Sequence, residues 1–327
     1  MLKILKKLYK NTAVSSKEEN LKREIVNMLP DDCEFYEDYL GNLIVKKNAN
    51  SKTNKKIIFT ANLDENGLMV TKITEDGSVL FSTVGNIKTH SLIGCHVNLN
   101  NKINGIIGSK PIHLQNKKEK KIKVEDLHID IGCNSKREAE KIVRVGDIFS
   151  FNNNFSEISK DCFSANSLGD RVCCFVLIKL LQQTSNLSLT CVFIVKEKAI
   201  LNSSKTAAYS TNPTTAIILK PVFTCNFCNI DLHNNVLCLI RDKGAIYDEQ
   251  LIKTAETIAQ KNNIPFDKIV LDKIVPTAKN IATSQTGVKT LTLALCCKKF
   301  GEINVVNLEN INNFLNLTIK LAEKLCN

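Results

Sequence analysis

The spacing of apolar residues predicts helices and strands in alternation over the first 67 residues and again after residue 158. In residues 17–29, Leu21, Ile25, Met28 and Leu29 fall on one face of a helix, and the run at 42–47 follows as a strand. Further helices are expected near residues 171–184, 248–262 and 308–325, and further strands at 189–196, 214–220, 236–242 and 289–295. This order is typical of an α/β domain.

Residues 68–158 show a different pattern. Short strand-like runs are broken there by glycine and asparagine, which predicts a small all-β unit. We therefore expect two domains. Residues 1–67 plus 159–327 should form a mixed sheet flanked by helices, and residues 68–158 should form an inserted β-rich domain.

The run at 55–67 is the first candidate for a functional site. After two lysines it is mainly apolar over residues 57–61 and then reads Asn62-Leu63-Asp64-Glu65. A buried strand that ends in polar and acidic residues delivers those side chains to the edge of a sheet where α/β proteins place their sites.

Charge and composition narrow the function. The formal net charge is +11, yet only five of the 44 basic residues are arginines, and the lysines are spread along the chain. Nucleic-acid-binding proteins usually carry clustered arginines, so we expect no nucleic-acid partner. The chain starts with lysines interleaved with apolar residues, unlike a signal peptide or a membrane span, and we expect a cytoplasmic protein without membrane contact.

The 13 cysteines are an odd number, which favours free thiols in a reducing compartment. Those in apolar runs, such as Cys173 and Cys174, fit small buried hydrophobes. Cys225 and Cys228 form a single C-x-x-C without a second pair, so two ordinary cysteines are favoured there over a zinc or redox site.

Five stretches give the chain a resemblance to a known family. They are YLGNLIVKK at 39–47, TANLDENGLMV at 60–70, GIIGSKPIHL at 105–114, the run at 126–151 and SLGDRVCC at 167–174. In order and spacing they resemble the tetrahedral, deblocking or glutamyl aminopeptidases. The resemblance implies a zinc-aminopeptidase-like α/β domain interrupted by a small β-barrel dimerisation domain, and two zinc or cobalt ions that activate a water molecule.

The resemblance also implies five metal ligands, and this sequence departs from the family at each position. The former metal positions carry no ligand of the family type; they are Asn62, Gly169, Lys198, Lys220 and Gly301. The retained histidines lie elsewhere, and His113 is interpreted as structural. The sequence therefore predicts no bound metal and no cofactor.

Some acidic and basic residues of the family motifs remain. Glu197 stands at the position of the general base, Asp64 is kept in the first motif, and Asp170 and Arg171 follow the lost bridging aspartate. Removing two dications would leave carboxylates without counter-charge, so we expect lysine ammonium groups to replace the metals in salt bridges.

The expected function is that of a non-catalytic homologue, or pseudo-enzyme, which binds a ligand or serves as an assembly subunit. It would self-associate through the β-domain into a homo-oligomer such as a dodecamer, with an active paralogue as a further partner. The alternative is an active metallo-aminopeptidase that cleaves N-terminal residues from peptides and uses displaced ligands such as Asp64, Asp170, Glu197 and Glu302.

Overall fold

The structure is a computed structural model that describes the chain except for residues 48–55, 110–121, 153–154, 185–186, 200–201, 224–234 and 327. Its larger unit is built on an eleven-stranded mixed sheet in the order β1-β2-β12-β3-β13-β16-β17-β11-β10, with β14 between β16 and β15 as a branch. The strands of this sheet are β1 (Cys33–Glu37), β2 (Leu43–Lys47), β3 (Ile57–Asn62), β10 (Ser156–Ser159), β11 (Cys162–Asn166), β12 (Leu189–Ile194), β13 (Thr215–Phe223), β14 (Val236–Arg241), β15 (Phe266–Val270), β16 (Lys289–Phe300) and β17 (Ile303–Asn307).

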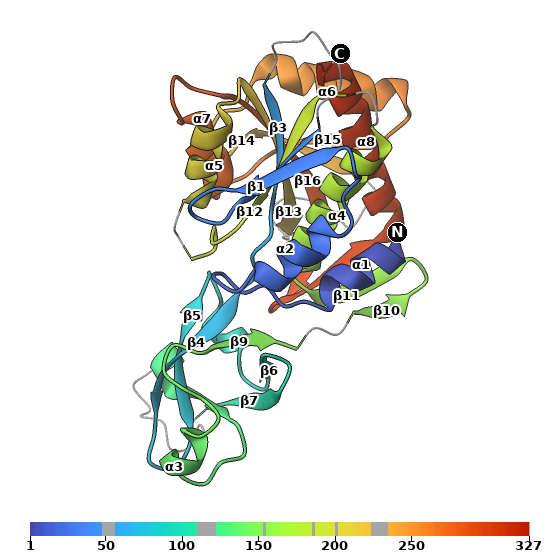
Figure 1. Cartoon of the computed structure of the whole chain (residues 1–327). Coiled ribbons are helices and arrows are strands. Elements are labelled where there is room, and N and C mark those ends of the chain that lie inside the picture. The colour runs from blue at the N-terminus through green and yellow to red at the C-terminus, as the bar shows by residue number, and fades with distance from the viewer. Residues whose placement is uncertain are drawn as a thin grey trace.

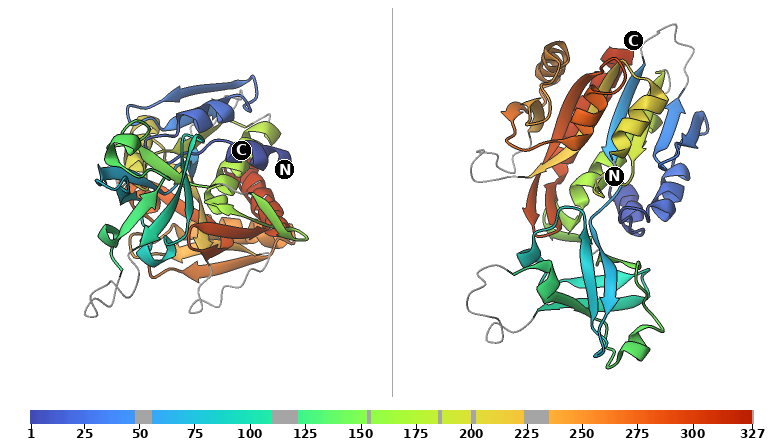
Figure 2. Two further views of the ribbon diagram at one scale, coloured as in Figure 1. Left: turned by 90° about the horizontal axis from the view of Figure 1, so that it is seen from below. Right: turned by 90° about the vertical axis from the view of Figure 1, so that its left-hand side faces the viewer.

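Helices cover both faces of this sheet (Figures 1 and 2). They are α1 (Leu2–Tyr9), α2 (Glu19–Val26), α4 (Leu168–Gln183), α5 (Ser203–Thr211), α6 (Glu249–Lys261), α7 (Pro276–Ala282) and α8 (Leu308–Cys326). α4 is apolar around nearly its whole circumference because it packs between the sheet and its neighbours α1 and α8. On the opposite face, α5 and α7 pack together.

The central strands are parallel. β3 lies between β12 and β13, and β13 pairs with β16, all in the same direction. Every residue of β3 is buried, as its continuous apolar run predicts for a strand covered on both faces. Parallel strands end at the same edge of a sheet, so the residues that follow β3 and β12 come together there.

The smaller unit is a closed barrel in the order β4-β5-β8-β7-β6-β9, drawn below the sheet in Figure 1. Its strands are β4 (Gly67–Ile73), β5 (Val79–Val84), β6 (His96–Leu99), β7 (Ile103–Ser109), β8 (Leu127–Asp130) and β9 (Ile148–Phe151), with the short helix α3 (Lys136–Ala139) beside them. It has its own apolar core, which includes Leu68, Ile129 and Phe149. The expected fold class, a mixed α/β sheet interrupted by a small barrel, is confirmed.

Several elements were not predicted from the sequence pattern. The spacing at the N-terminus does not predict α1, whose Leu5 and Leu8 are fully buried against the main core. The short helices α5 and α7 are likewise unexpected, and β16 continues five residues beyond the predicted strand at 289–295. None of the helices in the described part combines the length and hydropathy that crossing a bilayer requires.

Candidate functional site

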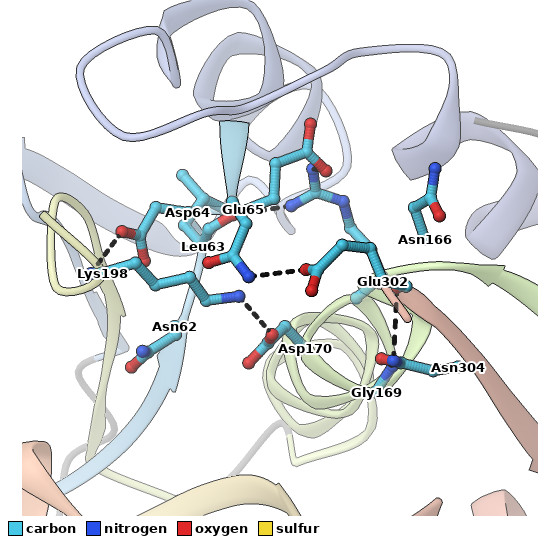
Figure 3. Close-up of polar contacts among 12 residues, drawn as sticks. Asn62, Leu63, Asp64, Glu65, Asn166, Gly169, Asp170, Lys198, Glu302 and Asn304 are labelled. Carbon is cyan, nitrogen blue, oxygen red and sulfur yellow. Dashed lines mark hydrogen bonds and ion pairs between the residues drawn. The ribbon is translucent and has the colours of Figure 1, made fainter. Parts of the chain in front are cut away.

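The candidate site lies where β3 and β12 end and α4 begins. Asn62 is the last residue of β3, and Asp64 follows two residues later. The parallel strand β12 ends at Ile194, so the loop carrying Lys198 runs beside them. The first turn of α4 brings Asp170 to the same place from about 100 residues away in the sequence, as Figure 3 shows.

Lys198 joins the two aspartates. Its ammonium group lies 2.7 Å from Asp170 Oδ2, and its backbone N–H donates to Asp64 Oδ2 at 2.7 Å. Burial lowers the pKa of Lys198, but the negative charges of Asp170 and Asp64 outweigh burial and raise this pKa above its ordinary value. The ammonium group therefore stays charged at neutral pH and offsets the nearby carboxylates.

Asp64 is the most strongly perturbed carboxyl of the site. Its side chain is fully buried, and burial raises its pKa to about 6, although Lys198 and the Ser15 hydroxyl at 2.6 Å lower it. Oδ1 of Asp64 has no hydrogen-bond partner among the described residues. A buried carboxyl oxygen without a partner favours the protonated form.

Arg171 has a structural role beside this pair. It is fully buried, and its guanidinium donates to the Leu63 carbonyl at 2.6 Å and to Glu65 Oε2 at 3.0 Å. The other oxygen of Glu65 accepts the backbone N–H of Ala13 at 2.8 Å. This network ties α4 to the segment after β3 and to the segment after α1.

Glu197 forms no ion pair with a described residue. Its oxygens accept hydrogen bonds from the Ser204 hydroxyl at 2.8 Å, the Ser204 backbone N–H at 3.2 Å and the Thr277 hydroxyl at 3.1 Å. The Thr277 hydroxyl also lies 3.4 Å from Oδ1 of Asn62. Glu197 and Asn62 are therefore bridged by a buried threonine that the sequence did not single out.

Lys220 is the second lysine that the sequence predicts in a salt bridge at the site. No described residue forms an ion pair with Lys220, so its salt bridge stays a prediction. Its backbone lies in β13, opposite Ala294 of β16. Within the described part of the chain, Lys198 alone of the two lysines neutralises a carboxylate of the site.

Gly169 is packed too closely to carry a side chain. A Cβ atom built on it would lie 2.4 Å from Cβ of Pro221 and 3.0 Å from the Cys297 sulfur. Real Cβ atoms do not approach other carbons so closely. The space that a side chain at Gly169 would need is thus filled by Pro221.

Gly301 lies in the turn between β16 and β17 with a φ of +60°, and its nearest neighbour from elsewhere in the chain is Ser91 of the barrel. The adjacent Glu302 accepts from the Asn66 amide at 2.6 Å and pairs with Lys299 at 3.3 Å. This side of the site is therefore closed by a carboxylate with two partners of its own.

These residues do not fit a pair of divalent metal ions. Asn62 offers an amide, Lys198 and Lys220 offer ammonium groups, and Gly169 and Gly301 offer no side-chain donor, whereas a pair of divalent ions needs anionic or imidazole donors. Among the described residues, no three His, Cys, Asp or Glu side chains are grouped so that they could hold a metal. Cys225, Cys228 and His113 lie outside the described residues.

Comparison with known proteins agrees with the fold and the motifs. Residues 41–317 match the M42 glutamyl aminopeptidase family, and the chain belongs to that family. The TET1 peptidase of Pyrococcus horikoshii shares 30% identity and a TM-score of 0.87 over 98% of each chain. An aminopeptidase of the archaeon Desulfurococcus kamchatkensis has a TM-score of 0.91 at 25% identity, over 98% of this chain and 94% of that one. The lysyl aminopeptidase of Pyrococcus furiosus is 24% identical over 98% of this chain and 96% of its own.

Proposed function

We propose that this chain is a non-catalytic member of the M42 family, in which a salt bridge has replaced the metal pair. The observation that carries the proposal is the ammonium group of Lys198, 2.7 Å from Asp170. An ammonium group neutralises a carboxylate, but it has no open coordination position and does not lower the pKa of a bound water molecule to near neutrality. The chemistry that the family draws from its two metals is then missing.

The packing around Gly169 supports the same conclusion. Restoring an aspartate there would require β13 to move, because Pro221 occupies the space of the side chain. A site that had lost one ligand by a single substitution could recover it. Here the backbone of α4 and the ring of Pro221 have closed together over the lost position.

The burial and hydrogen bonding of Glu197 also support a non-catalytic role. A general base must reach a substrate or a water molecule, directly or through one water. Glu197 is 8% exposed, and its two oxygens are engaged by Ser204 and Thr277. Through these hydrogen bonds Glu197 stabilises the junction of α5 and α7. Asp64 and Glu197 are then vestiges of the family's catalytic residues.

The retained barrel suggests an assembly role. The TET1 peptidase of Pyrococcus horikoshii can assemble into a tetrahedron or a large octahedral shell. We propose that residues 68–158 form the domain through which this chain self-associates in the cytoplasm, alone or with an active relative. Residues 1–67 plus 159–327 would form the aminopeptidase-like domain.

Two measurements on the purified chain test this function. Elemental analysis after incubation with zinc or cobalt should give well under one equivalent of tightly bound metal, and aminoacyl-p-nitroanilides should not be hydrolysed. Size-exclusion chromatography with light scattering should give a homo-oligomer. Two bound metal ions together with N-terminal trimming of peptides would refute the proposal and favour an active enzyme with displaced ligands.

A further inference from the structure

A second site lies away from the Lys198 pair. An open surface cavity of about 510 Å³ lies between α1, the turn that joins β6 to β7, and the residues Asn152 and Phe155. α1 lies beside the β10–β11 hairpin, near the side of the barrel that carries this turn (Figure 1). The volume falls in the range of small-molecule pockets, about 300–1,000 Å³. None of the residues of the candidate site described above lines it.

The charged groups of this cavity are all positive. Lys6 on α1 and Lys10, the C-cap residue that follows it in helical conformation, are four residues apart and so lie on the same side, and the cavity lining contains no acidic residue. Neither lysine forms an ion pair with a described residue, whereas Lys7 on the same helix reaches Glu24 at 3.9 Å. Two unpaired ammonium groups that repel each other are stabilised by an anion that accepts from both.

Asparagine amides line the side of the cavity that faces the barrel. Asn98 is 6% exposed and is fully engaged, because its amide donates to Asn152 at 2.9 Å and its oxygen accepts the backbone N–H of Asn101 at 3.2 Å. These bonds fix Asn152 and the β6–β7 turn. They leave the Nδ2 of Asn152 and the side-chain amides of Asn101 and Asn104 without a partner among the described residues.

An aromatic ring completes the cavity. Phe155 is half-buried, with its ring 5.4 Å from the ring of Tyr9 and stacked on Phe163 at 5.5 Å. The Tyr9 hydroxyl donates to the Asn166 carbonyl at 3.3 Å, so the aromatic wall is held from behind. Amides that donate and accept, next to a fixed aromatic face, are suited to a hydroxylated ring.

We propose that this cavity binds a small phosphorylated sugar. The phosphate accepts from the ammonium groups of Lys6 and Lys10, the sugar hydroxyls exchange hydrogen bonds with Asn101, Asn104 and Asn152, and an apolar face of the sugar rests on Phe155. The inference does not depend on whether the chain is catalytic, since the two sites share no residue.

Isothermal titration with glucose 6-phosphate, glucose and inorganic phosphate tests the proposal. We expect glucose 6-phosphate to bind with a dissociation constant of about a millimolar or below, and at least tenfold more tightly than glucose or phosphate alone. A Lys6→Ala/Lys10→Ala variant should weaken this binding at least tenfold, since a hydrogen bond to a charged group contributes about that factor. Asn104→Ala should weaken the binding of glucose 6-phosphate more than the binding of phosphate.

The matched control is Lys3→Ala/Lys7→Ala, which removes the same charge from the same helix outside the cavity. It should leave the affinity within about twofold, because neither Lys3 nor Lys7 lines the cavity. Equal weakening by both double variants would mean general charge attraction and would overturn the site. So would equal binding of phosphate and glucose 6-phosphate, or no binding of any probe at about 10 mM.

Discussion

Replacing Lys198 with methionine is the sharpest test of the salt bridge between Lys198 and Asp170. Methionine keeps most of the apolar stem and removes the ammonium group, so the change leaves Asp170 without its partner at 2.7 Å. Removing one member of a buried ion pair costs about 3–5 kcal/mol. The side chain of Lys198 is 20% exposed and that of Asp170 is 9% exposed, so some solvent screening remains and we expect about 2–3 kcal/mol.

The assay is urea unfolding at fixed protein concentration and pH 7. At this pH the stabilising effect of Lys198 is fully present, because the raised pKa of its ammonium group means that the effect is lost only above the ordinary lysine value of 10.5. Lys205→Met on α5 is the control: Lys205 is exposed and has no described ion-pair partner, so the loss should stay below about 0.5 kcal/mol.

A double-mutant cycle with Asp170→Asn separates the pair from the single side chains. The double variant should lose clearly less stability than the sum of the two single variants, because each single change already breaks the same contact. Lys198→Glu should be worse than Lys198→Met, since it adds a carboxylate beside Asp64 and Asp170. Additive effects, or a Lys198→Met variant as stable as the control, would refute the idea that this ammonium group replaces the metals.

Three further predictions follow from the same region. Relative to the unmodified chain, the unfolding free energy of Asp64→Asn should be about 3 kcal/mol more favourable at pH 7 than at pH 4. The folded-state pKa of Asp64 is about 6, so folding of the unmodified chain is progressively disfavoured as pH rises from about 4 to 6. A difference in urea midpoint that does not depend on pH would contradict this. Gly169→Ala should destabilise by about 1–3 kcal/mol although alanine is the better helix former, because its Cβ meets Pro221; a higher melting temperature for the variant would show that β13 yields easily. Arg171→Lys should lower the unfolding free energy by about 3 kcal/mol, because one ammonium group cannot donate to both the Leu63 carbonyl and Glu65. A lysine variant that unfolds like the unmodified chain would show that these two hydrogen bonds do not stabilise the fold.

Much of the fold was accessible from the sequence, for identifiable reasons. The apolar run of β3 and the apolar stripe of α8 each follow the period of one element, so their positions could be predicted within a few residues. The break in pattern after residue 67 marked the barrel. In contrast, α1 and α5 are only 8 and 9 residues long, and such short helices are stable because of what they pack against rather than because of their own pattern.

The candidate site was predicted less completely. Motif position identified Asp64, Asp170 and Lys198, and the structure brings these three together. Motif position also suggested a salt bridge for Lys220, which forms no ion pair with a described residue. Ser15 and Thr277 were missed, since a serine or threonine far away in the sequence carries no signal that its hydroxyl will meet a carboxylate.

The sequence by itself determined the family and much of the order of helices and strands, because these depend on which residue stands at each position of a motif; it also predicted the residues at the five proposed metal positions. Only the tertiary structure decided that Lys198 meets an aspartate, that Pro221 leaves no room for a side chain at Gly169, and that hydroxyl groups bind Glu197. These contacts join residues 7 to 80 or more positions apart, and their geometry is set by strand order and by the packing of α4 on the sheet.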